Sequence, residues 1–439
     1  MASWRYTLVQ YNGLTGQGNI LYPDPPLAPS DPTVALSGED AFSFTIPAYV
    51  PDLVGPDGDA IIRRWETGVV VEREGLAPMV FIVTSVTEER DTLQVDCLGV
   101  TALLSGQPYR AVRAFNQDDA AAIYRHIWSH HLAYNGAKFP VTVDAGFKSG
   151  VPIGYIPLRV NDAKLEEVSV KLDKAEESVD KAQAASDKKP ADVSLKKALA
   201  SLKAARDALR KQREALSAQV EAESKKAEAY AKKMQGKGLE EYVLAWYDNV
   251  DLASKASELA EVGGFDFYTS HAWVGDTITS RVHLQKAEPA PENPGRFQAG
   301  ENIIEDVPVS MPTEGYATDV WFNGAGEGSA RLFAASAHDA TSTAMTRWVV
   351  KEDASVKSKS ILQVKANEQA KRSRDSVSIS EVACIDHDYA PIGSVRLGDA
   401  LFLLGSGEGY NGSIDRWVKV TAITYSVETD QVRYSVVPI

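Results

Sequence analysis

The chain has 439 residues, 44% of them hydrophobic, so it can bury a large core and should form roughly two to four domains. No stretch approaches the ~20 consecutive apolar residues that a transmembrane helix requires. The net charge of −14 argues against a protein that grips nucleic acid over its whole surface, because phosphate contacts require Lys and Arg.

Strand-like segments fill the first ~100 residues, where helical periodicity is absent. The expected strands are Trp4–Tyr11, Ala41–Ile46, Trp65–Arg73, Phe81–Val86 and Thr92–Cys97. A polar turn, Glu88–Asp91, separates the last two, and apolar residues alternate with polar ones in the second of them. This pattern predicts an antiparallel hairpin with one buried face.

The first change of periodicity comes at Asp118–Leu132, which we expect to be a helix with Asp118 or Asp119 as its cap. A heptad pattern then begins near residue 163, where Asn161 and Asp162 are candidate N-caps. Its apolar residues are spaced 3, 4, 3, 4 and 3 apart: Leu165, Val168, Leu172, Ala175, Val179 and Ala182.

Pro190 interrupts this first arm, and a second arm follows in which Leu195, Leu202, Leu209 and Leu216 recur every seven residues. Two helices joined by a short proline turn should fold back antiparallel, with these ten apolar residues as their seam. The second arm should end at Gly236-Lys237-Gly238. The shorter arm would be roughly 35 Å long at about 1.5 Å per residue.

The charge of this hairpin differs from that of the rest of the chain. Residues 163–237 hold 18 of the 46 basic and 13 of the 60 acidic residues, so the hairpin is +5 and the remainder is −19. The charges either form a solvated coiled-coil exterior or contact an acidic neighbour, and the sequence leaves both interpretations open.

After the hairpin, Leu239–Asp248 and Leu252–Val262 are expected to be helices, and Phe265–Tyr268 and Thr277–Leu284 strands. A polar stretch containing Pro289, Pro291 and Pro294 should be a loop or linker. The remainder, including Ala317–Asn323, is expected to be β-rich. It should end in a hairpin of Val418–Thr424 and Val432–Val437 about a turn at Glu428–Asp430.

Candidate chemical sites are weak. His126 and His130 stand four apart on the expected helix but lack the Glu of zinc peptidases, and Asp386-His387-Asp388 is more typical of a surface turn. The glycine-rich segments 324–328 and 405–409 lack a Gly-Lys-Ser/Thr sequence, and each contains an acidic residue that would repel phosphate. We therefore predict no catalytic, cofactor-binding or metal-binding residue, and a protein that is not an enzyme.

The two cysteines, Cys97 and Cys384, should be ordinary half-buried residues, because they are too few for a disulfide framework or a metal knuckle. The first residues, Met1–Leu8, lack the pattern of a signal peptide, so we expect synthesis in the cytoplasm.

Four blocks of sequence resemble the tail hub or minor tail proteins of long-tailed, siphovirus-type bacteriophages, especially those that infect actinobacteria. They follow the order found in that family and cover most of the chain outside the hairpin. The first is Trp65–Gly75 with the strands up to Leu104, the second is Tyr242–Asp248 with Leu259–Trp273, the third is Ala317–Gly328, and the fourth is Arg396–Ala400 with the terminal hairpin.

The resemblance implies an α+β, multi-domain, β-rich hub fold with β-barrel domains and a mixed middle domain, into which the long antiparallel hairpin is inserted. The expected boundaries are 1–110 for the N-terminal barrel, 111–162 with 239–310 for the middle domain, 163–238 for the hairpin and 311–439 for the C-terminal hub domains. The hairpin departs from the family, so no family role applies to it.

The implied function is that of a structural virion protein at the tail tip. A homotrimer would close the tail tube, join the distal tail protein ring to tip and fibre proteins, and let the tape-measure protein and DNA pass through its lumen without specific binding. Two alternatives stay open, a host-surface protein that binds a receptor or polysaccharide, and a cell-wall hydrolase. Exposure of Trp273, Trp321 and Trp417 should distinguish a receptor binder from a hub.

Overall fold

The computed structural model divides the chain into two compact units. Unit 1 contains Met1–Arg113, Asp118–Ile153 and Val243–Ile439, and unit 2 contains Ala114–Gln117 and Gly154–Tyr242. The residues that the structure describes are 3–10, 19–49, 53–54, 58–134, 141–158, 162–190, 192–237, 239–288, 295–305, 307, 309–310, 316–326, 328, 331–337, 345–353, 359–374, 378–405 and 415–439.

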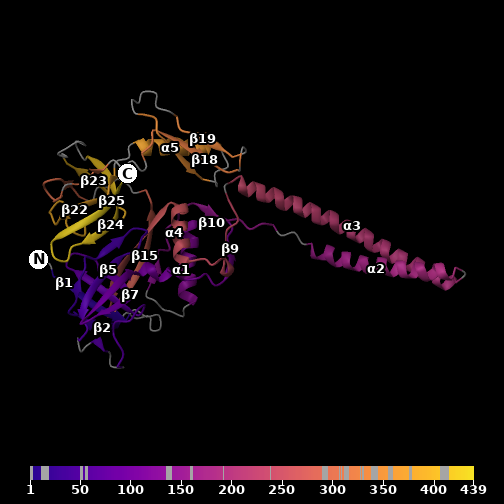
Figure 1. Cartoon of the computed structure of the whole chain (residues 1–439), viewed down its shortest axis with the longest axis horizontal. Helices are drawn as coiled ribbons and strands as arrows, with labels where there is room; N and C mark the ends of the chain where they lie inside the picture. Colours follow the sequence, from indigo (N-terminus) through magenta and orange to yellow (C-terminus); the bar gives the residue numbers. More distant parts are fainter. Residues whose placement is uncertain are drawn as a thin grey trace. The chain divides into compact units, whose positions relative to one another are not determined.

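Alternating apolar residues build the N-terminal part of a 13-stranded sheet in unit 1 (Figure 1). In β5, Phe42, Phe44 and Ile46 are buried while their neighbours are more exposed. The predicted hairpin is confirmed, since β7 and β8 pair antiparallel up to Glu89 and Thr92. The strands are β1 (Trp4–Gln10), β2 (Asn19–Pro23), β3 (Ala28–Pro29), β4 (Thr33–Ala35), β5 (Ala41–Pro47), β6 (Thr67–Arg73), β7 (Met79–Glu89) and β8 (Thr92–Gly99).

Strands from the C-terminal end of the chain complete the same sheet. The short strand β4 joins the two parts, because Ala35 pairs with Ala422 of β24 and Thr33 pairs with Ala41 of β5. The predicted terminal hairpin is confirmed in β24 and β25. These strands are β16 (Phe297–Gln298), β22 (Glu381–Ile385), β23 (Ala400–Leu404), β24 (Arg416–Tyr425) and β25 (Gln431–Pro438). One core cluster contains buried residues from both parts, among them Phe81 and Val420.

Two α-helices and the long β-hairpin of β14 and β15 form the middle of unit 1. Tyr124 of α1, fully buried, contacts Phe265 and Phe267 of β14 with ring centroids 5.7 and 5.3 Å apart. Gly264 ends α4 in the left-handed conformation with φ 62°, which glycine adopts without strain. The elements are η2 (Val100–Leu104), β9 (Val112–Ala114), β10 (Asp118–Asp119), α1 (Ala120–Tyr134), β11 (Val141–Val143), β12 (Pro152–Ile153), β13 (Val243–Ala245), η3 (Trp246–Asp248), α4 (Leu252–Gly263), β14 (Phe265–Val274) and β15 (Thr277–Lys286).

The expected helix at Leu239–Asp248 is wrong. Residues 239–242 are not helical, Val243–Ala245 is strand β13, and only Trp246–Asp248 forms a single 3₁₀ turn. The strand pairs with β9, and Trp246 N donates to Ala111 O over 2.9 Å, so its backbone groups are satisfied by a distant segment. Strand pairing has overridden the local helical preference.

A smaller sheet with one helix lies in the last third of the chain. Leu362 of α5 is buried and clusters with Ala334 of β19, and Phe322 and Leu332 pack against them. The helix itself was not predicted, since this third was expected to be β-rich. The sheet contains β18 (Asp319–Asn323), β19 (Phe333–Ala335) and β20 (Trp348–Glu352), and the helix is α5 (Lys359–Arg374). Two further strands, β17 (Val309–Ser310) and β21 (Ser378–Ile379), pair with each other.

Unit 2 consists mainly of two long helices, α2 (Ala163–Lys188) and α3 (Val193–Gln235), drawn in magenta tones in Figure 1. Among the described residues, none of the helices has the length and apolar character needed to cross a bilayer. The predicted proline linker near residues 289–294 lies outside the described part of the chain.

Candidate functional site

The hairpin of α2 and α3 begins and ends where its sequence signals place it. The side chain of Asp192 accepts hydrogen bonds from the backbone N–H groups of Ser194 and Leu195, at 2.9 and 3.2 Å, and so caps α3. The expected cap of α2 is only half correct: Asp162 is at the N-cap but makes no side-chain capping bond, and Asn161 lies outside the described residues. Helix α3 ends at Gln235, before Gly236, as predicted.

Two polar contacts fix the antiparallel register of the hairpin. Lys203 Nζ donates to Gln183 Oε1 over 2.9 Å, and Arg210 Nη2 pairs with Glu176 Oε1 over 2.6 Å. The two residue numbers sum to 386 in both pairs. Helix α2 therefore lies beside α3 only up to about residue 223, and the last turns of α3 extend beyond it.

The ten residues of the expected seam differ in burial. Val168, Leu172 and Val179 are buried, with at most 6% of each side chain exposed. The other seven are half-buried: Leu165, Ala175, Ala182, Leu195, Leu202, Leu209 and Leu216. The seam predicted from the sequence lacks Leu199, which is only 8% exposed. Leu195, Leu199 and Leu202 are spaced four and three residues apart, so this heptad spacing in α3 would have identified Leu199.

The far end of α3 packs against other residues of unit 2. Met234 is buried in a cluster with Tyr155 and Leu239, and Tyr230 and Ala231 pack against it. Tyr155 and Tyr230 meet edge to face with centroids 6.2 Å apart. The base of α3 is thus held by apolar contacts of its own, independently of α2.

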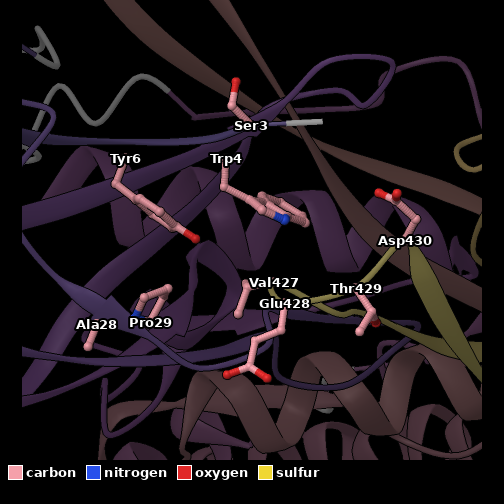
Figure 2. A pocket seen from close by; sticks show the side chains of 9 residues that line it. All are labelled: Ser3, Trp4, Tyr6, Ala28, Pro29, Val427, Glu428, Thr429 and Asp430. Atoms are coloured by element: carbon pink, nitrogen blue, oxygen red, sulfur yellow. The ribbon is translucent and has the colours of Figure 1, made fainter. Parts of the chain in front are cut away.

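An open cavity of about 450 Å³ lies in unit 1, beside strand β1 and the turn between β24 and β25 (Figure 2). Its lining combines two aromatic side chains, two carboxylates and three hydroxyl groups, one of them the phenol of Tyr6: Ser3, Trp4, Tyr6, Ala28, Pro29, Val427, Glu428, Thr429 and Asp430. Figure 2 shows Trp4 and Tyr6 from the first strand and Glu428 and Asp430 from the terminal turn around the same space. No sequence pattern predicted this cavity, because residues far apart in the chain build it.

A buried arginine fixes one wall of this cavity. Arg73 is 7% exposed, its Nη2 lies 2.6 Å from Asp430 Oδ1, and its guanidinium lies 5.5 Å from the centre of the Trp4 ring. The ion pair with Arg73 balances the negative charge of Asp430. The contact of the guanidinium with the ring holds Trp4 in place. Burial, together with the negative charge of Asp31, raises the pKa of Tyr6 to about 12, so its hydroxyl keeps its proton at neutral pH.

The histidines of α1 bind protein groups. His126 Nε2 lies 2.9 Å from Tyr109 Oη and its Nδ1 lies 3.0 Å from Arg113 Nη1, and His130 Nε2 accepts the backbone N–H of Arg110 over 3.1 Å. Burial, assisted by the charge of Arg113, lowers the pKa of His126 to about 4. In the parts of the chain that are described, no group of three or more His, Cys, Asp or Glu side chains could hold a metal ion.

The remaining candidates also have structural partners. Asp386 Oδ1 accepts from Ile392 N over 2.8 Å and His387 Nδ1 accepts from Tyr389 N over 3.2 Å, so both serve a turn. Most of the glycine-rich segment 405–409 lies outside the described residues. So does Glu327 of the glycine-rich segment 324–328. Cys97 and Cys384 are free and fully buried, and burial raises the pKa of both thiols, that of Cys384 to about 12.

The three tryptophans chosen as indicators of a receptor-binding surface are all half-buried. Trp273 Nε1 donates to Glu72 over 3.0 Å, Trp321 stacks on Phe333 with centroids 4.7 Å apart, and Trp417 contacts Phe402 at 5.2 Å. None of them offers a fully open aromatic platform.

Two solved structures with a similar fold are a prophage tail protein and a tail protein from a bacterial strain. The 43 kDa tail protein of prophage MuSo2 from Shewanella oneidensis is 10% identical, with a TM-score of 0.53, and the match covers 99% of this chain and 98% of that one. The tail protein from Neisseria meningitidis MC58 is 11% identical with a TM-score of 0.51, covering 100% and 97%. At these identities the likeness shows that the chain has the fold of phage tail proteins, including its mixed α and β character.

No protein-family model matches the chain, and the search of curated proteins gave no match. The fold of the whole chain therefore connects it to known proteins.

Proposed function

We propose that the protein is a structural component of a bacteriophage tail, a homotrimeric hub at the tail tip that closes the tube and joins the distal tail ring to tip and fibre proteins. The observation that supports this most is the extent of the fold likeness, because essentially the whole chain superposes on two tail proteins from end to end. Four sequence blocks that resemble hub proteins of long-tailed phages support the same role. The four-domain division and the β-barrels form part of this proposal.

The charge of the chain suits a channel for DNA. Outside residues 163–237 the net charge is −19, and a wall with the same sign as DNA does not exchange counterions with it and so does not hold it. The tape-measure protein and the genome would then pass without specific binding. That acidic residues of the chain face the lumen is part of this proposal.

Light scattering coupled to gel filtration tests the hub directly. Full-length protein should elute as a trimer, at about three times the 47.6 kDa chain mass, alone or with the distal tail ring protein. Electron micrographs of virions labelled on this protein should show the label at the tail tip. A monomer at high concentration in the presence of the ring protein would overturn the trimeric hub, and a label on the head or along the tube would overturn its location.

A second candidate function, binding of a host-surface polysaccharide, is favoured by one observation. The cavity in Figure 2 combines the ring of Trp4, on which a sugar can stack, with the carboxylate of Glu428 and the hydroxyl of Thr429, which can bind sugar hydroxyls. Host cell-wall polysaccharide should then bind the wild type and bind Trp4→Ala at least tenfold more weakly. Equal binding by both proteins would exclude this cavity as the site, and release of soluble fragments would instead point to a hydrolase.

A further inference from the structure

Helix α2 carries a regular line of acidic residues along one flank of the hairpin. Four acidic residues of α2 are spaced seven apart and therefore form one line along the helix: Glu166, Asp173, Asp180 and Asp187. This acidic row lies beside the residues that contact α3, since Asp173 and Asp180 precede Glu176 and Gln183 by three positions. All four residues of the acidic row are exposed.

The acidic residues in the middle of α3 lie on the same flank. Asp207 and Glu214 follow Lys203 and Arg210 by four positions each, so they lie next to the side chains that reach α2. This flank of the hairpin therefore carries acidic residues of both helices, next to the basic side chains of Lys203 and Arg210.

The opposite flank of α3 has no acidic residue between Val193 and Val220. At about 100° per residue, Lys203 lies to one side of Leu202 and Ala205 to the other. Apart from Gln212, the exposed residues at the centre of that other side are small or basic, and we call these small and basic residues the alanine–lysine face: Lys197, Ala198, Ser201, Ala204, Ala205, Ala208, Lys211 and Ala215.

The alanine–lysine face has the spacing of a second helix-packing surface, but its residues are exposed and no described residue of unit 2 packs on it. Its small side chains allow another helix to approach closely. Lys197 and Lys211 have no ion-pair partner among the described residues, and neither have Asp173 and Asp180 of the acidic row. The hairpin buries little by itself, because the buried residues of α2 and α3 beside one another are only Val168, Leu172, Val179, Ser186 and Leu199.

We infer that the occupant of this face is a second copy of the chain, whose acidic row lies against the alanine–lysine face of its neighbour. The two surfaces are complementary in charge, whereas two alanine–lysine faces together would oppose lysine to lysine. A contact between two different surfaces of one molecule closes into a ring when the rotation permits it. The inference rests on the proposed trimer, in which three hairpins would then pack side by side.

The internal register of the hairpin indicates which residues meet. Rotation about a symmetry axis keeps each residue at its own height, so for hairpins along that axis a residue of α3 faces residues of the neighbour's α2 at the same height. Residue numbers at one height sum to about 386, as Lys203 with Gln183 and Arg210 with Glu176 show. Lys211 then meets Asp173, and Lys197 meets Asp187.

Cysteine cross-linking in the full-length protein tests this contact. Asp180→Cys and Ala208→Cys place one thiol on each surface at nearly the same height, on opposite flanks of a single hairpin. The native thiols of Cys97 and Cys384 are only 2% exposed and do not compete for a short bis-maleimide reagent. We expect the double variant to give covalent dimers and trimers, and each single variant to react about tenfold more slowly or not at all.

Light scattering on the same samples separates the possible outcomes. Cross-linked trimers that form faster in low salt than in 1 M salt, where the screening length falls from about 10 Å to about 3 Å, would support the inference. A trimer by light scattering without cross-links would overturn the hairpin contact and leave the hub standing. A monomer would overturn both, and efficient dimers from Ala208→Cys alone would mean that like faces meet.

A charge exchange provides the matched control. Lys197→Glu with Lys211→Glu should abolish cross-linking between the two cysteines, and adding Asp173→Lys with Asp187→Lys should restore it. Loss without restoration would show that charge pairing does not make the contact. Helix content by circular dichroism should be equal in all variants, because every substituted side chain is exposed.

Discussion

At the scale of single residues, the carboxyl group of Asp40, which directly precedes β5, is a buried acid with a raised pKa. It is 4% exposed and accepts hydrogen bonds from Ala35 N over 2.7 Å and Thr269 Oγ1 over 3.0 Å. Burial raises its pKa to about 6, against the lowering effect of these two bonds. A Cβ atom on Gly99 would overlap this side chain, so glycine is needed there.

Asp40→Asn should stabilise unit 1 at neutral pH. Because the folded-state pKa lies above the unfolded value, the wild type is favoured while Asp40 is protonated, and this contribution is lost as pH rises from about 4 through about 6. Asparagine keeps the bond from Ala35 and can donate to Thr269, but it carries no charge. We expect a gain of up to about 3 kcal/mol at pH 7 and almost none at pH 4, measured by urea unfolding.

The exposed Asp96→Asn is the matched control for this prediction, and it should change stability equally little at both pH values. Equal destabilisation by Asp40→Asn at pH 4 and pH 7 would mean that the carboxyl geometry, rather than its ionisation, governs the site. None of this could be predicted from sequence, since Ala35, Thr269 and Gly99 meet Asp40 only in the folded chain.

At the scale of elements, patterns that repeat locally were predicted well. The heptad spacing gave both arms of the hairpin and its proline turn, because each residue's neighbours in a helix lie three or four positions away. The helix expected at Leu239–Asp248 failed because strand β13 pairs with β9 more than a hundred residues earlier. Helix α5 was missed because its segment, Lys359–Arg374, is mostly polar and its few apolar residues form only a weak helical pattern.

Leu199→Ala should loosen the hairpin without affecting the large sheet. Leu199 is the most buried residue of α3 within the overlap with α2, and removing a buried leucine side chain costs about 2–5 kcal/mol. We expect a loss near 2 kcal/mol, because the site is narrow and close to solvent. Hydrogen exchange should accelerate in α2 and in α3 up to about residue 223, while amides of β6 and β7 keep their protection.

Val193→Ala, at a side chain that is 77% exposed, should leave these exchange rates unchanged. If Leu199→Ala also accelerated exchange near Met234, the base of α3 would depend on the α2 contact after all. The cluster of Tyr155, Met234 and Leu239 argues for its independence.

At the scale of the whole molecule, the sequence did not reveal that the two ends of the chain share a sheet. Thr33 and Thr424 bond through their hydroxyl groups at 2.8 Å although they are 391 positions apart. Among the described strands, the short pairing of β4 with β24 joins the N-terminal strands to the C-terminal ones. Local periodicity cannot specify such a pairing, so the expected separate N- and C-terminal domains were drawn from resemblance alone. The hairpin, in contrast, is continuous in sequence and belongs to unit 2.

Removal of the hairpin should separate its role in assembly from the folding of the sheet. Joining residues 162 and 238 with a Gly/Ser linker deletes α2 and α3 but leaves every strand of the 13-stranded sheet intact, so its unfolding temperature should change by less than about 2 °C. Tail-tip assembly in a complementation assay should fall strongly. Unfolding of the whole chain would instead show that unit 1 depends on the hairpin.

A shorter deletion distinguishes the base of the hairpin from its length. Removing residues 166–220 joins α2 to α3 at the same height in the register and keeps Tyr230, Met234 and their contacts with Tyr155. This variant should fold like the wild type, yet assemble as poorly as the full deletion, because the acidic row and the alanine–lysine face are both absent. Normal assembly by the shorter variant would mean that the hairpin acts in assembly through the base of α3. The apolar cluster around Met234, and not the charged flanks, would then be the part that assembly requires.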